Sequence, residues 1–195
     1  IARAKDRCLA PGDDLSALEL GRLAAEVDFG EAYRLYQERL RGAGCLDFGD
    51  LLLESVRLLS SFPQVRSLLQ ARFRAVLVDE YQDSNHAQFR LLELLHDPSN
   101  YLCAVGDEDQ SIYSFRGAEL DNILGFAEHF PGTRVVRLEQ NYRSAANILE
   151  VATRVVEHNR RRLGKTLWTH RPSGAPVELA VLELIVEGLT NAEIA

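Results

Sequence analysis

The sequence is poor in cysteine, in long apolar runs and in positive charge, and each shortage excludes a class of protein. Its three cysteines, Cys8, Cys45 and Cys103, are odd in number and lack metal-ligand spacing. This argues against a disulfide framework or a zinc site and favours a reducing, cytoplasmic setting. No apolar run approaches the ~20 residues that cross a bilayer, and the start lacks the apolar core of a signal peptide, so we expect no membrane partner.

The charge balance limits contact with nucleic acid. The 195 residues carry a formal net charge of −7, whereas a general polyanion binder needs clustered Lys and Arg to release counterions. Any nucleic-acid contact must therefore be local. With 46% apolar and 26% charged residues, the chain can bury the core of one domain or of adjoining parts of two. It begins without Met in charged helical sequence, which favours a segment cut from a longer protein.

Two kinds of periodicity divide the chain. Apolar residues recur at helical spacing from Leu15 to Leu40, and a further helix runs through residues 51–59 and stops near Pro63. Short apolar or β-branched runs then follow at residues 75–78, 101–105 and 133–138. Because helical stretches around residues 89–95 and 120–130 separate these runs, the pattern predicts an α/β fold with a parallel sheet.

The last third of the sequence predicts one long helix and one more strand. The helix runs from Ala145 to about Leu163, with Ser144 placed to cap it, and the strand covers residues 177–181. We find no internal repeat and no low-complexity tract.

The first group of candidate functional residues follows the run Ala75-Val76-Leu77-Val78. Its carboxyl end delivers two adjacent acids, Asp79 and Glu80, and ligands of open α/β sheets bind at that end. Mg²⁺ prefers carboxylate and water oxygens, so Asp79 is a candidate metal ligand and Glu80 a candidate for orienting a water. A pair of acids alone would more often cap the next helix.

The second group follows the run at residues 101–105. Gln110 offers an amide suited to a terminal phosphate, while Tyr113, Phe115 and Arg116 alternate aromatic and cationic groups on which unpaired bases stack. For the aromatic residues alone, core packing would be the commoner explanation.

The third group, Leu138-Glu139-Gln140-Asn141-Tyr142-Arg143-Ser144, precedes the predicted long helix. The guanidinium of Arg143 is a planar fork suited to phosphate, and an arginine that reaches across a domain cleft stabilises charge during phosphoryl transfer. For an arginine taken alone, an ion pair of Arg143 with Glu139 or a nearby acid would be the commoner explanation.

Together the three strings resemble UvrD/Rep/PcrA-type superfamily 1 DNA helicases. Asp79-Glu80-Tyr81-Gln82-Asp83-Ser84 is similar to the Walker B signature of that family. The segment 105–118 resembles its third motif, with Ser114-Phe115 where many members have Arg-Trp, and the segment 138–144 resembles its fourth. The resemblance is strong from Ala75 to Ser144.

The resemblance implies a role for each candidate in binding ATP and Mg²⁺. Asp79 would hold Mg²⁺ and Glu80 would position the attacking water. Gln110 and Arg143 would contact the γ-phosphate, and Tyr142 would stack on adenine.

The resemblance also implies contact with DNA. Tyr113, Phe115 and Arg116 would line the path of single-stranded DNA, translocation would run 3′ to 5′, and the partners would be single strands and single/double-strand junctions. The implied fold is a RecA-like P-loop NTPase motor. The tail of an inserted helical subdomain would cover residues 1–45, the later half of the first motor domain residues 46–132, and the start of the second residues 133–195. Leu46–Leu52 is similar to the segment that opens the return from that subdomain.

Three alternatives stay open. The chain lacks a Walker A motif, which fits a non-catalytic scaffold of helicase ancestry. Residues 184–195 resemble the first turn and helix of LuxR-type DNA-binding domains and so favour a regulator, although Thr190 and Glu193 also form an ordinary capping box. A helicase–nuclease subunit is the third.

We predict that the isolated 195-residue chain does not hydrolyse ATP. Gly164-Lys165-Thr166 is no Walker A motif, because Asn159 stands where the motif needs glycine and the run Arg160-Arg161-Arg162 precedes it rather than a strand. We expect Gly164 to let the chain leave the helix instead. Phosphate release with single-stranded DNA present is the measurement, and DNA-stimulated turnover abolished by Glu80→Gln would contradict the prediction.

Overall fold

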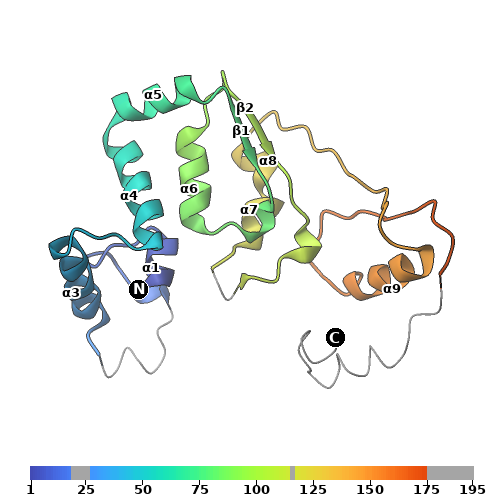
Figure 1. Ribbon diagram of the computed structural model, residues 1–195, viewed down its shortest axis with the longest axis horizontal. Coiled ribbons are helices and arrows are strands. Elements are labelled where there is room, and N and C mark those ends of the chain that lie inside the picture. The colour runs from blue at the N-terminus through green and yellow to red at the C-terminus, as the bar shows by residue number, and fades with distance from the viewer. Residues whose placement is uncertain (19–26, 115–116, 175–195) are drawn as a thin grey trace. The chain divides into compact units, whose positions relative to one another are not determined.

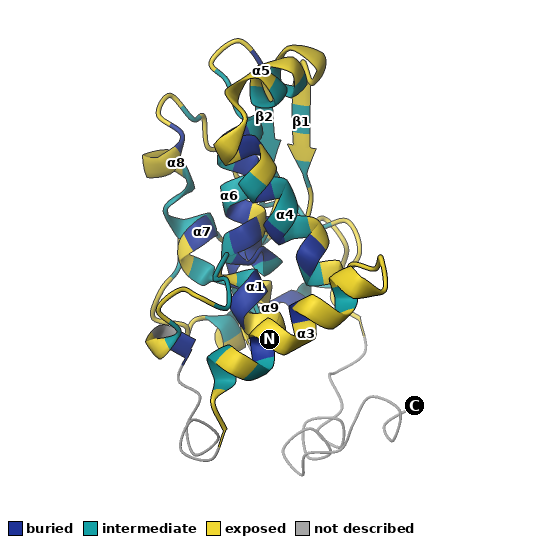
Figure 2. Ribbon diagram, turned by 90° about the vertical axis from the view of Figure 1, so that its left-hand side faces the viewer, coloured by how far each residue is buried: buried dark blue, intermediate teal, exposed yellow. Residues whose placement is uncertain are grey.

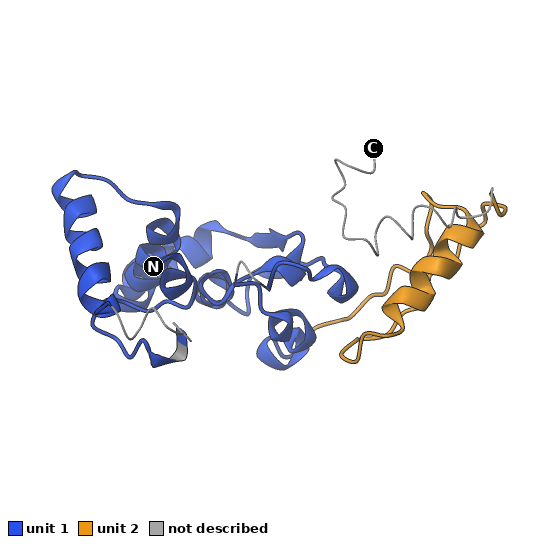
Figure 3. Cartoon of the chain, turned by 90° about the horizontal axis from the view of Figure 1, so that it is seen from below, with its two compact units in different colours: residues 1–131 blue, residues 132–195 orange. Residues whose placement is uncertain are grey.

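The computed structural model describes residues 1–18, 27–114 and 117–174 and divides the chain into two compact units, residues 1–131 and 132–195 (Figure 3). Several predicted features lie outside the described residues: Phe115, Arg116, the strand at 177–181 and the LuxR-like segment 184–195. Of the helices that the structure describes, none has the length and apolar character that a bilayer crossing requires.

The first unit combines helices with a small parallel sheet (Figure 1). Its helices are α1 (Ala2–Asp6), α3 (Phe29–Gly42), α4 (Phe48–Ser61), α5 (Pro63–Arg72), α6 (His86–Leu95), α7 (Leu120–Leu124) and α8 (Phe126–His129). Short 3-10 turns accompany them among the described residues, namely η1 (Ser16–Leu18), η2 (Tyr81–Asp83) and η3 (Glu108–Gln110).

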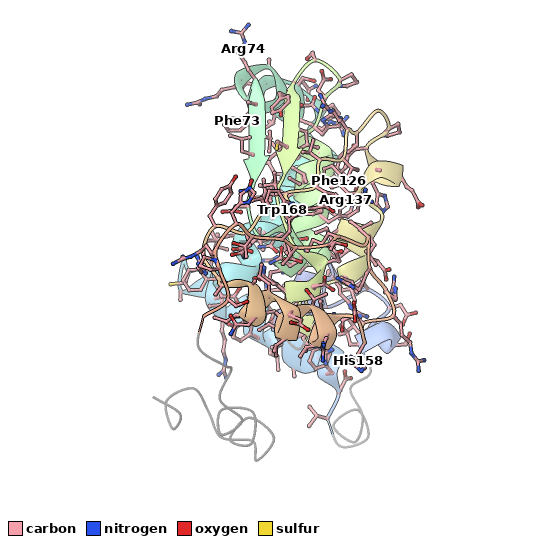
Figure 4. All side chains as sticks on the ribbon, turned by 90° about the vertical axis from the view of Figure 1, so that its right-hand side faces the viewer. Phe73, Arg74, Phe126, Arg137, His158 and Trp168 are labelled. Carbon is pink, nitrogen blue, oxygen red and sulfur yellow. The ribbon has the colours of Figure 1, made fainter. Side chains whose placement is uncertain are left out.

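The sheet pairs β1 (Ala75–Val78) with β2 (Tyr101–Ala104) in parallel, with Ala75 opposite Tyr101 and Val78 opposite Ala104. These strands confirm two of the three predicted runs and the α/β class. Phe73 and Arg74 lead into β1 at its amino end, where the Arg74 carbonyl accepts the Tyr101 N–H at 2.9 Å (Figure 4).

One face of the sheet is covered by helices. Val76 and Val78 of β1 and Leu102 and Ala104 of β2 pack against a core formed by Tyr81, Phe89, Leu92 and Phe130. Alternation along the strand sends Leu77 to the other face, where it is 73% exposed. Figure 2 shows exposed residues on β1. The predicted helical stretch 120–130 is broken at Gly125 into α7 and α8.

Helix ends follow from local residue chemistry. Asp47 and Asp50 form a capping box at the start of α4, and Asn85 and Gln88 form another at the start of α6. Pro63 does end α4, as predicted, but it also begins α5, which the sequence pattern did not reveal. Proline is favoured at the first helical position, where its missing N–H has no intrahelical partner.

A buried ionic cluster joins α1 to α4. The Lys5 side chain is fully buried, and its Nζ lies 2.6 Å from an Asp47 oxygen and 2.8 Å from an oxygen of the equally buried Asp50. Gln37 of α3 donates to Asp50 at 2.8 Å, and the Tyr36 hydroxyl donates to Asp47 at 2.8 Å. The segment 46–52, singled out in the sequence, thus pairs with a cation near the start of the chain.

The same cluster shifts the titration of Asp47. Burial, the largest single influence, raises the pKa of this carboxyl, but hydrogen bonds from Lys5, the Asp50 amide and Tyr36 outweigh it. Together they lower the pKa of Asp47 from 3.8 to about 2.

The second unit differs from the sequence-based prediction in two places. Residues 133–138 form no strand, and Val136 and Leu138 are 64% and 78% exposed. A short apolar run forms a parallel strand only beside a neighbour, and within the described part of this unit the pairing is a single bridge between Gln140 and Trp168. The predicted strand is therefore wrong.

The long helix of the second unit is shorter than predicted. It is α9 (Ala146–Val156), and its N-cap is Ala145 rather than Ser144. The N-cap makes no side-chain hydrogen bond, and the Ser144 N–H, one residue earlier, donates to the Asn141 side chain at 2.7 Å. The helix ends eight residues before Gly164, whose φ of +74° is adopted in the following loop and not at the helix end.

We predict that Lys5→Met lowers the free energy of unfolding by roughly 3–5 kcal/mol, because it leaves the buried Asp50 without its cation. Urea unfolding at neutral pH measures the effect. Since the folded-state pKa of Asp47 is lowered, its contribution to stability is present above pH 3.8 and is lost as the pH falls through about 2. Lys5→Met should remove most of this acid dependence.

Arg34→Met is the matched control. Arg34 pairs with Glu31 and Glu38 on the surface of α3, where ion pairs contribute about 0–1 kcal/mol. Equal losses of stability in the two variants would contradict a special role for the buried cluster.

Candidate nucleotide site and DNA-binding segment

The candidate site begins where the two parallel strands end. Beyond the last strand pair, the Val105 N–H donates to the Val78 carbonyl at 2.8 Å, and the Tyr81 N–H donates to the Val105 carbonyl at 2.9 Å. These bonds bring Asp79 and Glu80 to the same sheet edge as Gly106 and Asp107. Because the two strands are parallel, both segments leave the sheet at its carboxyl edge, where ligands of open α/β sheets bind.

Glu80 occupies an uncommon backbone conformation at this edge. Its φ is +50° and its ψ is 42°, in the left-handed region, which costs a residue with a side chain about 1–2 kcal/mol. The Asp79 carboxylate accepts the Glu80 N–H at 2.9 Å, and η2 follows at once. Both acids are exposed. A strained residue held at the end of a strand is a frequent feature of functional sites.

Gln82 connects this turn to the loop after β2. Its side chain is 1% exposed, its Nε2 donates to a Glu80 carboxylate oxygen at 2.7 Å, and its Oε1 accepts the Asp107 N–H at 3.0 Å. The Ser111 hydroxyl donates to the Gln82 backbone carbonyl at 3.2 Å. One buried residue therefore contacts both segments.

Gly106 permits this close approach. A Cβ at this position would lie 2.7 Å from the Gln82 Oε1 and 2.9 Å from the Ile123 Cδ1. Both distances are shorter than real Cβ contacts, so any larger residue displaces Gln82 or α7.

Gln110 reaches the same network through Asp107. The Asp107 carboxylate accepts the Asp109 N–H at 3.0 Å, which caps η3, and it accepts the Gln110 Nε2 at 2.8 Å. Hydrogen bonds thus run from Gln110 through Asp107 and Gln82 to Glu80. The structure brings Asp79, Glu80 and Gln110 to one edge of the first unit.

The segment proposed to contact DNA begins just after η3. Tyr113 is partly exposed, and its carbonyl accepts the Ala118 N–H at 3.3 Å. Ala118 also forms an antiparallel bridge with Asn85, and the Glu119 N–H donates to the Ser84 carbonyl at 3.1 Å. The far end of this segment is therefore tied to the end of the Walker B-like string.

Tyr142 and Arg143 belong to the second unit. Tyr142 is 76% exposed, and its hydroxyl donates to the Gln140 side chain at 2.9 Å. Arg143 is also exposed, and the described residues contain no ion pair of its side chain with Glu139 or another acid. The Glu139 carboxylate instead accepts the Thr166 N–H at 3.4 Å.

Two side chains fix the backbone of this loop. Asn141 accepts the N–H groups of Arg143 and Ser144, at 2.9 Å and 2.7 Å. The Arg171 guanidinium donates to the Arg143 carbonyl at 2.6 Å and to the Tyr142 carbonyl at 3.4 Å. The neighbouring Trp168, visible in Figure 4, bonds through its backbone to Glu139 and Asn141.

The comparison with protein families covers the first unit, which contains Asp79, Glu80 and Gln110. Residues 1–131, about two thirds of the chain, match the UvrD/REP helicase N-terminal domain. The chain belongs to the UvrD/REP helicase family. The predicted resemblance is therefore confirmed at the level of the family, and the strings at 79–84 and 105–118 lie within the matched residues.

Curated members of the UvrD/REP family are similar over most of the chain. It is 46% identical to the ATP-dependent DNA helicase UvrD1 of Mycobacterium tuberculosis over 186 residues, which cover 89% of the chain and 24% of that protein. It is 44% identical to DNA helicase II of Escherichia coli over 154 residues, covering 79% of the chain and 21% of the relative.

A third relative, the ATP-dependent DNA helicase PcrA of Leuconostoc citreum, is 42% identical over 174 residues, covering 89% of the chain and 23% of PcrA. The chain spans about a quarter of the length of the curated relatives it matches.

Asp79 and Glu80 fit Mg²⁺ better than they fit a metal ion whose ligands are all protein side chains. Among the described residues no group of three or more His, Cys, Asp or Glu is arranged to hold a metal ion. Mg²⁺ needs no such group, because it binds through one or two carboxylates together with waters and substrate phosphates. Asp79, exposed at the strand end, offers a carboxylate of this kind.

Sequence reasoning missed four residues that shape the site: Gln82, Gly106, Asp107 and Arg171. Gln82 and Asp107 stand inside recognised strings, but their contact joins residues 25 positions apart. Only the parallel pairing of the strands brings them together. For Arg171 the sequence contains no signal that we recognise.

We predict that Gly106→Ala lowers the free energy of unfolding by about 1–3 kcal/mol, because its Cβ overpacks against Gln82 and Ile123. Urea unfolding of the purified chain measures the change. The matched control is Gly42→Ala at the end of α3, where a Cβ meets nothing within 4 Å. If Gly106→Ala has the same free energy of unfolding as the control, the prediction is contradicted, because the loop after β2 then accommodates the Cβ without loss of stability.

Proposed function

We propose that this chain is part of an ATP-dependent 3′–5′ DNA helicase that couples ATP hydrolysis to movement on single-stranded DNA and to duplex unwinding. The observation that carries the proposal is the meeting of Asp79, Glu80 and Gln110 at the carboxyl edge of the β1–β2 sheet. Membership of the UvrD/REP family and relatives named as DNA helicases support it.

In the proposed site, each residue of the first unit has one task in phosphoryl transfer. Asp79 holds Mg²⁺, which when bound neutralises phosphate charge. Glu80 accepts a hydrogen bond from the attacking water and orients it toward the γ-phosphate. Gln110 exchanges its bond to Asp107 for a bond to the γ-phosphate, and so reports whether ATP is present.

In the proposed site, the second unit supplies two side chains that contact the nucleotide, Tyr142 and Arg143. Tyr142 offers an exposed ring for stacking on adenine, and Arg143 offers an exposed guanidinium for the γ-phosphate. The bonds from Asn141 and Arg171 hold the backbone of this loop, which supports a defined starting position for the arginine.

The proposed DNA contacts begin at Tyr113 and continue through Phe115 and Arg116. Aromatic rings stack on successive bases without regard to sequence, and the guanidinium adds a cation for base or phosphate. Since this segment follows Gln110 directly and is tied to Ser84 and Asn85, the bound strand and the nucleotide site share one loop. Single strands and single/double-strand junctions are the proposed partners.

The domain boundaries belong to the same proposal. Residues 1–45 form the tail of an inserted helical subdomain, residues 46–132 the later half of a RecA-like motor domain, and residues 133–195 the start of a second. The phosphate-binding loop would be supplied by sequence other than these 195 residues, since none of them forms a Walker A motif.

We predict that two substitutions in the full-length helicase lower the rate of ATP turnover for different reasons. Glu80→Gln removes the acceptor for the attacking water and should lower kcat by about 10²–10⁴-fold. Arg143→Ala removes a charge that stabilises the transition state and should lower kcat by about 10³–10⁵-fold. Phosphate release with single-stranded DNA present, together with strand separation, measures both.

Arg154→Ala is the matched arginine control. Arg154 lies on α9 in the same unit and forms an exposed ion pair with Glu150, so its loss should leave turnover unchanged. The proposal is overturned if Arg143→Ala behaves like Arg154→Ala, or if the unaltered full-length protein releases no phosphate.

A further inference from the structure

The buried side-chain amide of Gln82 lies between Glu80, the acid proposed to orient the attacking water, and the loop that carries Gln110. Gln82 is 1% exposed, and its side chain bonds to the Glu80 carboxylate at 2.7 Å and to the Asp107 N–H at 3.0 Å. Its two contacts come from the ends of two different strands.

The orientation of the amide follows from its partners. A backbone N–H can only donate, so the atom that faces Asp107 must be the amide oxygen. A carboxylate accepts, so the atom that faces Glu80 must be the amide nitrogen. Both contacts require the same orientation of the amide.

The contact fixes an acid that is otherwise free to rotate. Glu80 is exposed and has several rotatable bonds, whereas the Gln82 amide holds its Oε2 and leaves Oε1 for a water. The left-handed backbone of Glu80 and the absent side chain of Gly106 are what allow Gln82 to reach both partners.

The same amide joins Glu80 to the phosphate-sensing loop. Asp107, whose N–H binds Gln82, also holds the Gln110 side chain at 2.8 Å, and the Ser111 hydroxyl binds the Gln82 carbonyl at 3.2 Å. Asp107 therefore contacts Gln82 through its N–H and Gln110 through its carboxylate. One buried side chain connects the residue that holds Gln110 to the Glu80 carboxylate.

We infer that Gln82 is a positioning residue, which sets the Glu80 carboxylate for the attacking water and links its position to the loop that carries Gln110 and Tyr113. The inference rests on the proposed function. Gln82 touches neither phosphate nor DNA in this account, so it affects the rate of hydrolysis and not the binding of ATP.

Two variants of the full-length helicase test the inference. Gln82→Glu keeps the length and an oxygen for the Asp107 N–H but turns a second oxygen toward Glu80. Gln82→Met removes both hydrogen bonds at similar volume. We expect each to lower kcat for DNA-stimulated ATP hydrolysis by roughly 10–100-fold, the usual effect of losing a supporting contact, with KM for ATP and binding of a fluorescent ATP analogue unchanged.

The control is Gln88→Glu, which makes the same substitution on the exposed start of α6. Its side-chain oxygen accepts the Asn85 N–H, and glutamate suits that capping position, so kcat should stay at the wild-type value. Circular dichroism and the urea midpoint confirm that each variant is folded. If Gln82→Met does not fold, the kcat of Gln82→Glu alone tests the positioning role of Gln82.

The outcomes separate the inference from the function on which it rests. A wild-type kcat in Gln82→Glu overturns the inference while DNA-stimulated turnover by the unaltered protein leaves the proposed function intact. A rise in KM that matches the fall in kcat overturns it too, because it indicates general damage to the site. No hydrolysis by the unaltered protein overturns both.

Discussion

The parallel pairing of β1 with β2 is the constraint on which the site depends. Four residue pairs in register, from Ala75–Tyr101 to Val78–Ala104, make both strands end at one edge. Asp79 and Glu80 leave the sheet from one strand, and Gly106 and Asp107 leave it from the other. Because Val76, Val78, Leu102 and Ala104 pack on the helix-covered face, slipping the register would disturb the core as well as the site.

The site also depends on contacts that lie outside the sheet. Within the first unit, Gln82 and Asp107 connect the acids to Gln110, and Gly106 leaves the space in which they meet. Within the second unit, Asn141 and Arg171 set the backbone that carries Tyr142 and Arg143. Under the proposed function each unit supplies some of the residues that act on ATP.

The sequence predicted those parts of the fold that depend on short-range pattern. Strands form at 75–78 and at 101–104 of the predicted run 101–105, and the acid pair lies at the end of the first, because β-branched and aromatic residues favour strands. The sequence did not predict contacts between residues that are distant along the chain, which are those of Gln82 with Asp107, Lys5 with Asp47, and Arg171 with Arg143. The run at 133–138 had the right residue types but no neighbouring strand in the described residues, and Pro63 both ends one helix and begins another.

The central claim is that the edge of the β1–β2 sheet is one half of an ATP site that an arginine of the second unit completes. A structure of the full-length helicase with Mg²⁺, a non-hydrolysable ATP analogue and single-stranded DNA tests it most directly. The account predicts Mg²⁺ on Asp79, directly or through a bound water, with Glu80 and Gln110 facing the γ-phosphate and Arg143 in contact with it. A nucleotide bound away from Asp79 and Glu80, or a γ-phosphate that Arg143 does not reach, would contradict it.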